Sequence, residues 1–139
     1  MPARSVAVLI LHKPGGRILL QHRTKDAPTF PDYWAFFGGG IEEGESAEEA
    51  VKRESLEELA YDLARPGLFT TLKFSHHGNE HTMHVFVAEY DGAILTLGEG
   101  QAMGWFTPHE TRSLLMNDHD RSVIQALEKF LQRTPDPRA

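Results

Sequence analysis

The strongest local signal in this chain of 139 residues is a helix start at Ser46. Glu49 follows Ser46 at the spacing of a capping box, in which the two side chains satisfy backbone amides of the first helical turn. Three apolar residues of this segment share one side at helical spacing: Ala47, Ala50 and Val51. The pattern ends before Pro66-Gly67, so we expect a helix from Ser46 to about Tyr61.

Short apolar runs separated by turn residues predict strands on both sides of this helix. The expected strands are Arg4–His12, Arg17–His22, Tyr33–Phe37, Leu68–Ser75, His81–Tyr90 and Gly104–Phe106, with a further short strand at Ile94–Leu97. We expect Thr24–Asp32 to form a loop, and Gly78-Asn79 to form a turn between two of the strands.

Helical signals return near the C-terminus. The run from Thr107 to Glu110 has the residues of a helix start, with a cap, a proline and an acid in order. A last helix is expected from about Asp118 to Gln132, and its buried side is marked by Val123, Ile124, Leu127, Phe130 and Leu131. Because strands, hairpins and helices are interleaved, we expect an α+β fold in which helices pack on a mixed sheet.

The composition bounds the setting in which the chain works. It has no cysteine, which excludes disulfide frameworks and favours a reducing compartment. Its longest apolar run near the start, Val6–Leu11, is too short to span a membrane. We therefore expect a cytoplasmic protein with no membrane partner. The length suits one domain, so residues 1–139 are expected to form a single domain, with residues 134–139 as a frayed end.

The net charge of −6 is concentrated in one place. Residues 39–61 hold eight glutamates against Lys52 and Arg53, so this window carries the whole net charge. Such a segment repels the phosphates of a nucleic-acid polymer, and we do not expect a polymer of that kind as a partner. It attracts divalent cations, and these can in turn hold phosphate groups.

Some of these glutamates continue the side of the helix that should be apolar. They are Glu54, Glu57 and Glu58. Crowded ionised carboxylates repel one another, and a bound cation with a preference for oxygen ligands, such as Mg²⁺ or Mn²⁺, relieves that repulsion. A solvated glutamate-rich helix explains the same pattern, and the helix alone does not separate the two interpretations.

The sequence around this helix resembles the Nudix box, the signature of the Nudix hydrolases. The spacing G-x5-E-x7-R-E-x2-E-E is formed by Gly39, Glu45, Arg53, Glu54, Glu57 and Glu58. Ser55 and Ala60 depart from the family pattern, which usually has an aliphatic residue and a glycine there. Both departures bear on how the helix packs and ends rather than on its acids. The resemblance implies an α/β/α sandwich around a mixed sheet.

The same resemblance implies hydrolysis of a nucleoside diphosphate linked to a further group, with Mg²⁺ as cofactor and Mn²⁺ as a substitute. The implied metal ligands are the Gly39 carbonyl, Glu54, Glu57, Glu58 and Glu99. Arg53 joins the implied catalytic set, because at i,i+4 it can pair with Glu57. Glu45 is expected to close the box through hydrogen bonds. Glu99 is expected to be the general base or a further ligand, with an ordinary loop acid as the alternative.

Weaker similarity to MutT-type members extends beyond the box. Arg23 aligns with a position that contacts phosphate in those proteins, and Asn117 with a base-reading asparagine. Phe37 belongs to an aromatic run that could stack on a base. Each has a structural alternative, which is an exposed strand-end arginine for Arg23, a helix cap for Asn117 and a core aromatic for Phe37.

We therefore expect an enzyme that converts a nucleoside triphosphate, ordinary or oxidised, to the monophosphate and pyrophosphate. Dinucleoside polyphosphates and nucleotide sugars are the alternative substrates, and a non-catalytic nucleotide sensor with this fold is the alternative role. A calcium-binding interaction domain is disfavoured, because no loop has the alternating acids of such sites. The resemblance also allows a homodimer, although no residue pattern identifies an interface.

Four histidines gather around the expected turn at Gly78-Asn79: His76, His77, His81 and His84. Imidazole is a common zinc ligand, but no thiolate or ligand spacing accompanies these residues. We expect them to line the rim of a substrate cleft or to face solvent, with a structural metal as the alternative.

Overall fold

The computed structural model of the protein describes residues 4–98 and 100–133. Its contacts divide the chain into two compact units, each made of two stretches of sequence. The first unit comprises Met1–Leu11 and Phe37–Glu99, and the second comprises His12–Phe36 and Gly100–Ala139. The two units are described separately below.

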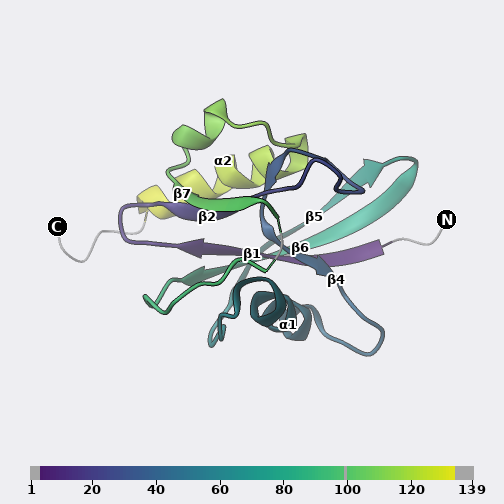
Figure 1. The fold of residues 1–139 in the computed structure, drawn as a ribbon, viewed down its shortest axis with the longest axis horizontal. Helices are drawn as coiled ribbons and strands as arrows, with labels where there is room; N and C mark the ends of the chain where they lie inside the picture. The colour runs from purple at the N-terminus through teal and green to yellow at the C-terminus, as the bar shows by residue number, and fades with distance from the viewer. Residues whose placement is uncertain (1–3, 99, 134–139) are drawn as a thin grey trace. The chain divides into compact units, whose positions relative to one another are not determined.

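The first unit combines a sheet with one helix. Strand β1 (Arg4–His12) pairs antiparallel with β4 (Phe37–Gly40), and within this unit it also neighbours β6 (Asn79–Glu89). Helix α1 (Ala47–Leu59) packs against β4 and also contacts β6 (Figure 1). The close pairing of β1 and β4 requires glycine at position 38, because a Cβ there would lie 2.2 Å from the Ala7 carbonyl oxygen.

A long hairpin completes the first unit. Strand β5 (Gly67–His76) pairs antiparallel with β6, and a bulge interrupts the register between Leu68 and Thr70. His76 faces Asn79, so the loop between the strands consists of His77 and Gly78, both with positive φ. Such a loop matches the twist of a hairpin. The turn therefore lies one residue earlier than the sequence analysis placed it.

The second unit is organised around β2 (Ile18–His22). This strand pairs antiparallel with β3 (Trp34–Ala35) and with β7 (Ala102–Phe106). A short 3₁₀ helix, η1 (Glu110–Ser113), and the helix α2 (Asp118–Arg133) follow β7 in the chain. The buried side of α2 is formed by Val123, Ile124 and Leu127.

Most predicted elements are confirmed, and the errors have local causes. The strand expected at Ile94–Leu97 is absent, and the Thr96 amide donates to the Leu59 carbonyl at the end of α1 instead. The strand expected at Tyr33–Phe37 is interrupted at Phe36, whose carbonyl accepts a hydrogen bond from the Gln21 side chain. Phe130, expected in the core, is 43 % exposed.

Two remaining expectations concern the C-terminal part of the chain. The helix expected to start near Thr107 is only the short η1, whereas the last helix has nearly the expected bounds. The frayed end expected at residues 134–139 lies outside the described residues. Within the described part of the chain, no helix is both long enough and apolar enough to cross a membrane.

The end of α1 yields the first testable prediction. Ala60 adopts a left-handed conformation, with φ 52° and ψ 34°, and this conformation disfavours any residue with a Cβ. Ala60→Gly should therefore raise the free energy of unfolding by about 0.5–1 kcal/mol, measured by chemical denaturation. Ala64→Gly, at an exposed position without positive φ, is the matched control and should not stabilise the protein. A destabilising Ala60→Gly would contradict this account of the helix end.

Candidate functional site

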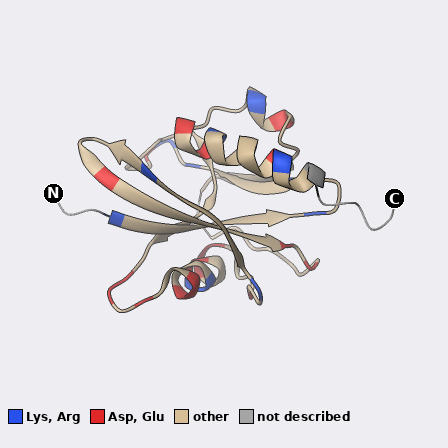
Figure 2. Ribbon diagram, turned by 180° about the vertical axis from the view of Figure 1, so that it is seen from behind, with Lys and Arg blue, Asp and Glu red and all other residues tan. Residues whose placement is uncertain are grey.

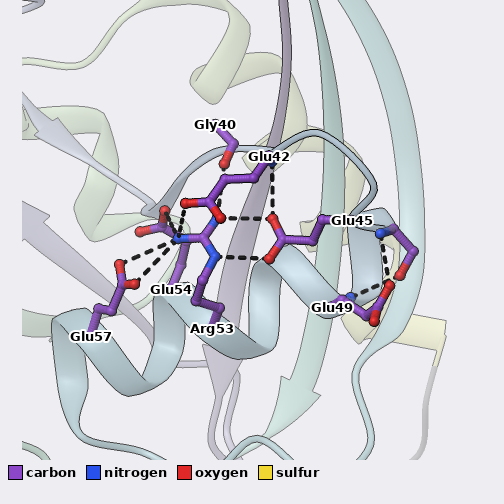
Figure 3. Close-up of polar contacts among 8 residues, drawn as sticks. Gly40, Glu42, Glu45, Glu49, Arg53, Glu54 and Glu57 are labelled. Carbon is purple, nitrogen blue, oxygen red and sulfur yellow. Dashed lines mark hydrogen bonds and ion pairs between the residues drawn. The ribbon is translucent and has the colours of Figure 1, made fainter.

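Capping hydrogen bonds fix the residue at which α1 begins. The Ser46 hydroxyl accepts a hydrogen bond from the Glu49 amide at 3.1 Å, and the Ser46 amide donates to the Glu49 carboxylate at 2.9 Å (Figure 3). These bonds lower the pKa of Glu49, so the cap is charged at neutral pH. The predicted capping box is confirmed, and it holds the first turn of the helix that carries the candidate site.

Arg53 ties this helix to the loop that precedes it. Its Nε and Nη2 donate to the two carboxylate oxygens of Glu45 at 2.8 and 3.0 Å, and Nη2 also donates to the Gly40 carbonyl at 3.0 Å (Figure 3). This is the forked contact that a guanidinium makes best. The end of β4, the loop and α1 are therefore held at a single side chain, and Glu45 closes the box as expected.

The pair of Arg53 and Glu45 is charged throughout the physiological range. Hydrogen bonding to Arg53 lowers the pKa of Glu45 to about 2, and the Glu42 amide adds to that effect. Hydrogen bonding to Glu45 is also the largest reason that the pKa of Arg53 is raised. A change of pH near neutrality therefore leaves both charges of this pair unchanged.

The other side of the Arg53 guanidinium faces further carboxylates. Its Nη1 lies 2.9 Å from Glu54, 3.3 Å from Glu57 and 3.8 Å from Glu42. The i,i+4 contact between Arg53 and Glu57 that the spacing predicts is thus present. With Glu45, four glutamates lie within 4.0 Å of one guanidinium, which leaves an excess of three negative charges in this group. Figure 2 shows the acids on α1 and the loop before it.

Glu54 lies directly against the backbone of β4. A Cβ built on Gly39 would be only 2.7 Å from Oε1 of Glu54 and 3.2 Å from its Oε2. Only glycine allows a carboxylate and a strand to come this close. Gly39 and Glu54, which the sequence analysis names as metal ligands, are therefore neighbours in the structure.

Glu58 has a different partner, the backbone of β4. It is 1 % exposed, and its Oε1 accepts a hydrogen bond from the Gly38 amide at 2.8 Å. The Glu57 side chain, in contrast, is 57 % exposed. Over residues 4–98 and 100–133, no three His, Asp or Glu side chains are grouped closely enough to hold a metal ion. The expected acidic trio therefore shares one helix, but its carboxylates do not converge as they stand.

The other predicted site residues have different surroundings. Phe37 is 2 % exposed, which supports its structural alternative as a core aromatic, and its contact with a base stays a prediction. In the second unit, Arg23 donates from Nε to the Thr29 carbonyl at 2.8 Å. Glu99 lies outside the described residues. The contacts predicted for Arg23 and Glu99 with substrate or metal stay predictions.

Asn117 caps helix α2 together with a buried acid that sequence reasoning missed. Its Oδ1 accepts from the Asp120 amide at 2.8 Å, and its Nδ2 donates to the Asp120 carboxylate at 3.2 Å. This supports the capping role that was the structural alternative for Asn117, and its contact with a base stays a prediction. Asp120 is 4 % exposed. Its position three residues after the capping Asn117 is the sequence signal that could have identified it.

Burial raises the pKa of Asp120 to about 7, although Asn117, the Phe36 amide and the charge of Arg23 favour its ionised form. The His119 ring is also near, with its Nε2 3.8 Å from Asp120 Oδ1. Asp120 is therefore a carboxyl group whose proton can leave near neutral pH.

The histidines at the β5–β6 turn form a group of rings. The centroids of His76 and His77 are 4.0 Å apart, and those of His76 and His81 are 6.4 Å apart. Burial lowers the pKa of His76, and its two neighbours lower it further. His84 instead contacts Thr71, with 3.2 Å between Nδ1 and Oγ1. Because the described residues contain no cluster that fits a metal ion, the zinc alternative gains no support.

Comparison with known proteins assigns the family. The NUDIX domain family matches residues 1–127, so this chain belongs to the NUDIX family. Among curated proteins, the nucleoside triphosphatase NudI of Escherichia coli O139:H28 is 38 % identical over 63 residues. That match covers 45 % of this chain and 44 % of NudI, less than half the length of either protein.

Solved structures share the fold over most of the chain. A MutT protein from Methanosarcina mazei has a TM-score of 0.83 at 21 % identity, covering 93 % of this chain and 95 % of that one. A MutT NUDIX hydrolase from Burkholderia pseudomallei has a TM-score of 0.79 at 25 % identity, covering 90 % and 98 %. The expected α+β fold class is therefore confirmed.

The buried acid gives a prediction about pH. The folded-state pKa of Asp120 is about 7, against about 3.9 in an unfolded chain, so the folded state binds its proton more tightly. The free energy of unfolding should therefore fall as pH rises from about 4 to about 7, by on the order of 4 kcal/mol from this group. Asp120→Asn, which mimics the protonated acid, should remove that fall and be the more stable protein at pH 8.

Urea denaturation at several pH values measures this difference. Asp118→Asn, at an exposed residue in the first turn of the same helix, is the matched control and should keep the wild-type dependence. If Asp120→Asn and wild type lost stability in parallel between pH 4 and 8, Asp120 would not be the group responsible.

Proposed function

We propose that this chain is a magnesium-dependent Nudix hydrolase that cleaves the pyrophosphate linkage of a nucleoside triphosphate, ordinary or oxidised. The products are the nucleoside monophosphate and pyrophosphate. The observation that carries this proposal is the group of four glutamates around Arg53, whose excess of three negative charges a divalent cation would reduce to one. Mn²⁺ has the same preference for carboxylate oxygens and is expected to substitute.

The chemical types of these donors suit such a cation. Carboxylate and carbonyl oxygens are the ligands that Mg²⁺ and Mn²⁺ prefer. Because Gly39 has no Cβ, the Glu54 carboxylate can lie against the backbone of β4. We propose Gly39, Glu54, Glu57 and Glu58 as the residues that hold the ion, with Glu99 as a further ligand or the general base. When bound, a divalent cation neutralises phosphate charge and lowers the pKa of water.

The chain's own residues would do the positioning. Arg53 holds the loop and β4 against α1 through Glu45 and Gly40, so the acids are presented from a rigid support. Glu54 and Glu57 share the Nη1 group of Arg53, which offsets only part of their charge. Glu57 is exposed, so it can turn toward a ligand by changing rotamer alone.

The choice of a nucleoside triphosphate rests on two supports. The curated relative at 38 % identity is named a nucleoside triphosphatase. The run Glu99-Gly100-Gln101 also resembles the segment that supplies a further glutamate in MutT-type triphosphate hydrolases. Dinucleoside polyphosphates and nucleotide sugars carry the same diphosphate group, so they belong in the test as competing substrates.

The test is a panel of nucleotides with Mg²⁺, with products separated by ion-exchange chromatography. Wild type should release pyrophosphate from at least one nucleoside triphosphate. Glu57→Gln keeps the shape of the side chain but removes its charge, and it should lower kcat on the order of 10³-fold. Glu43→Gln, at an exposed acid of the loop before α1, is the matched control and should keep wild-type turnover.

Two results would contradict the proposal. Turnover of Glu57→Gln close to wild type would remove Glu57 from the site. Tight nucleotide binding by wild type without release of any product would favour the non-catalytic sensor instead. Preferential cleavage of a dinucleoside polyphosphate or a nucleotide sugar would keep the enzyme class and correct the substrate.

A further inference from the structure

The segment 91–98 is bound along the C-terminal end of α1. The Thr96 amide donates to the Leu59 carbonyl at 2.9 Å, and the Gly98 amide donates to the Glu58 carbonyl at 2.7 Å. The Asp91 amide adds a bond to the Tyr61 hydroxyl at 3.3 Å. The last carbonyls of a helix have no partner within the helix, so this segment satisfies groups that would otherwise need water.

Gly98 touches the helix more closely than any other residue type could. A Cβ at this position would lie 2.7 Å from the Glu57 carbonyl oxygen and 3.3 Å from that of Glu58. Gly98 is not among the glycines with positive φ, so glycine is needed here for space and not for backbone conformation. The carbonyls belong to a hydrogen-bonded helix and yield little, so a side chain would push the segment away from α1.

Glu58 is thereby held through both its side chain and its backbone. Its carboxylate accepts a hydrogen bond from the Gly38 amide of β4, and its carbonyl accepts one from the Gly98 amide. Glu57 contributes the neighbouring carbonyl against which Gly98 packs. Segment 91–98 is thus seated on the backbone of Glu57 and Glu58, two of the residues that the sequence predicts as metal ligands.

We infer that Gly98 is a positioning residue, which seats segment 91–98 on the carbonyls of Glu57 and Glu58 and so holds the turn of α1 that carries these two acids. This inference rests on the hydrolase proposed above. It concerns only the described residues before Glu99 and makes the catalytic rate depend on the contact between Gly98 and the helix. Binding of the substrate, in contrast, does not depend on that contact.

The test compares Gly98→Ala with wild type in two measurements. Steady-state hydrolysis of the preferred nucleoside triphosphate should show kcat lowered at least about tenfold with KM within about twofold, because a displacement of about 1 Å at a catalytic group is enough for such a loss. Hydrogen exchange, which does not depend on activity, should become faster at the amides of residues 96 and 98. Exchange in the first turns of α1 should stay unchanged.

Gly67→Ala is the matched control. Gly67 also lacks a positive φ, and the nearest atom to a Cβ there is at 3.9 Å, an ordinary contact. This variant should match wild type in kcat, KM and amide exchange. If Gly98→Ala proves too unstable to assay, Thr96→Pro removes the other amide donor of the same segment without adding a group at Gly98, and it should lower kcat with KM retained.

The outcomes separate this inference from the proposed function. A wild type that hydrolyses no nucleotide contradicts the hydrolase and the inference together. An active wild type with Gly98→Ala at wild-type kcat, whether or not exchange is faster, overturns the inference alone. Wild-type kcat in Thr96→Pro would also overturn the inference. A loss confined to KM would also overturn it, since the contact would then serve binding.

Discussion

The structure of the candidate site depends on one guanidinium surrounded by carboxylates. Arg53 holds Glu45 through a forked contact, reaches the Gly40 carbonyl, and still lies within 3.3 Å of Glu54 and Glu57. The single positive charge organises the loop, the strand end and the helix, but it leaves the group strongly negative. In the proposed function a divalent cation would offset two of the three excess charges, so the support of the site and its proposed chemistry depend on the same residues.

The two departures from the family pattern combine at the end of α1. Ala60 adopts the left-handed conformation that glycine would take more easily. Ser55 is 2 % exposed, and its hydroxyl donates to the Tyr61 carbonyl at 2.8 Å, a bond that an aliphatic side chain could not make. The serine therefore anchors the residue that follows the unfavourable alanine. The carbonyls to which Thr96 and Gly98 bind belong to this same helix end.

Sequence patterns predicted the parts of the structure that depend on neighbours in the chain. The capping box at Ser46 and the contact of Arg53 with Glu57 follow from helical spacing, and both are present. Spacing does not state which way a side chain turns once strands pack against its helix, so the burial of Glu58 against Gly38 was not foreseen. The segment near Ile94 has a strand-like composition, but its amides bind helix carbonyls.

The central claim is that the acids around Arg53 bind a divalent cation, and Mn²⁺ titration followed by electron paramagnetic resonance tests it most directly. The account predicts saturable binding to the nucleotide-free protein, reversed by excess Mg²⁺ and accompanied by a rise in Tm as the metal concentration increases. A signal of free Mn²⁺ that grows in proportion to the added metal, with Tm unchanged, would contradict it.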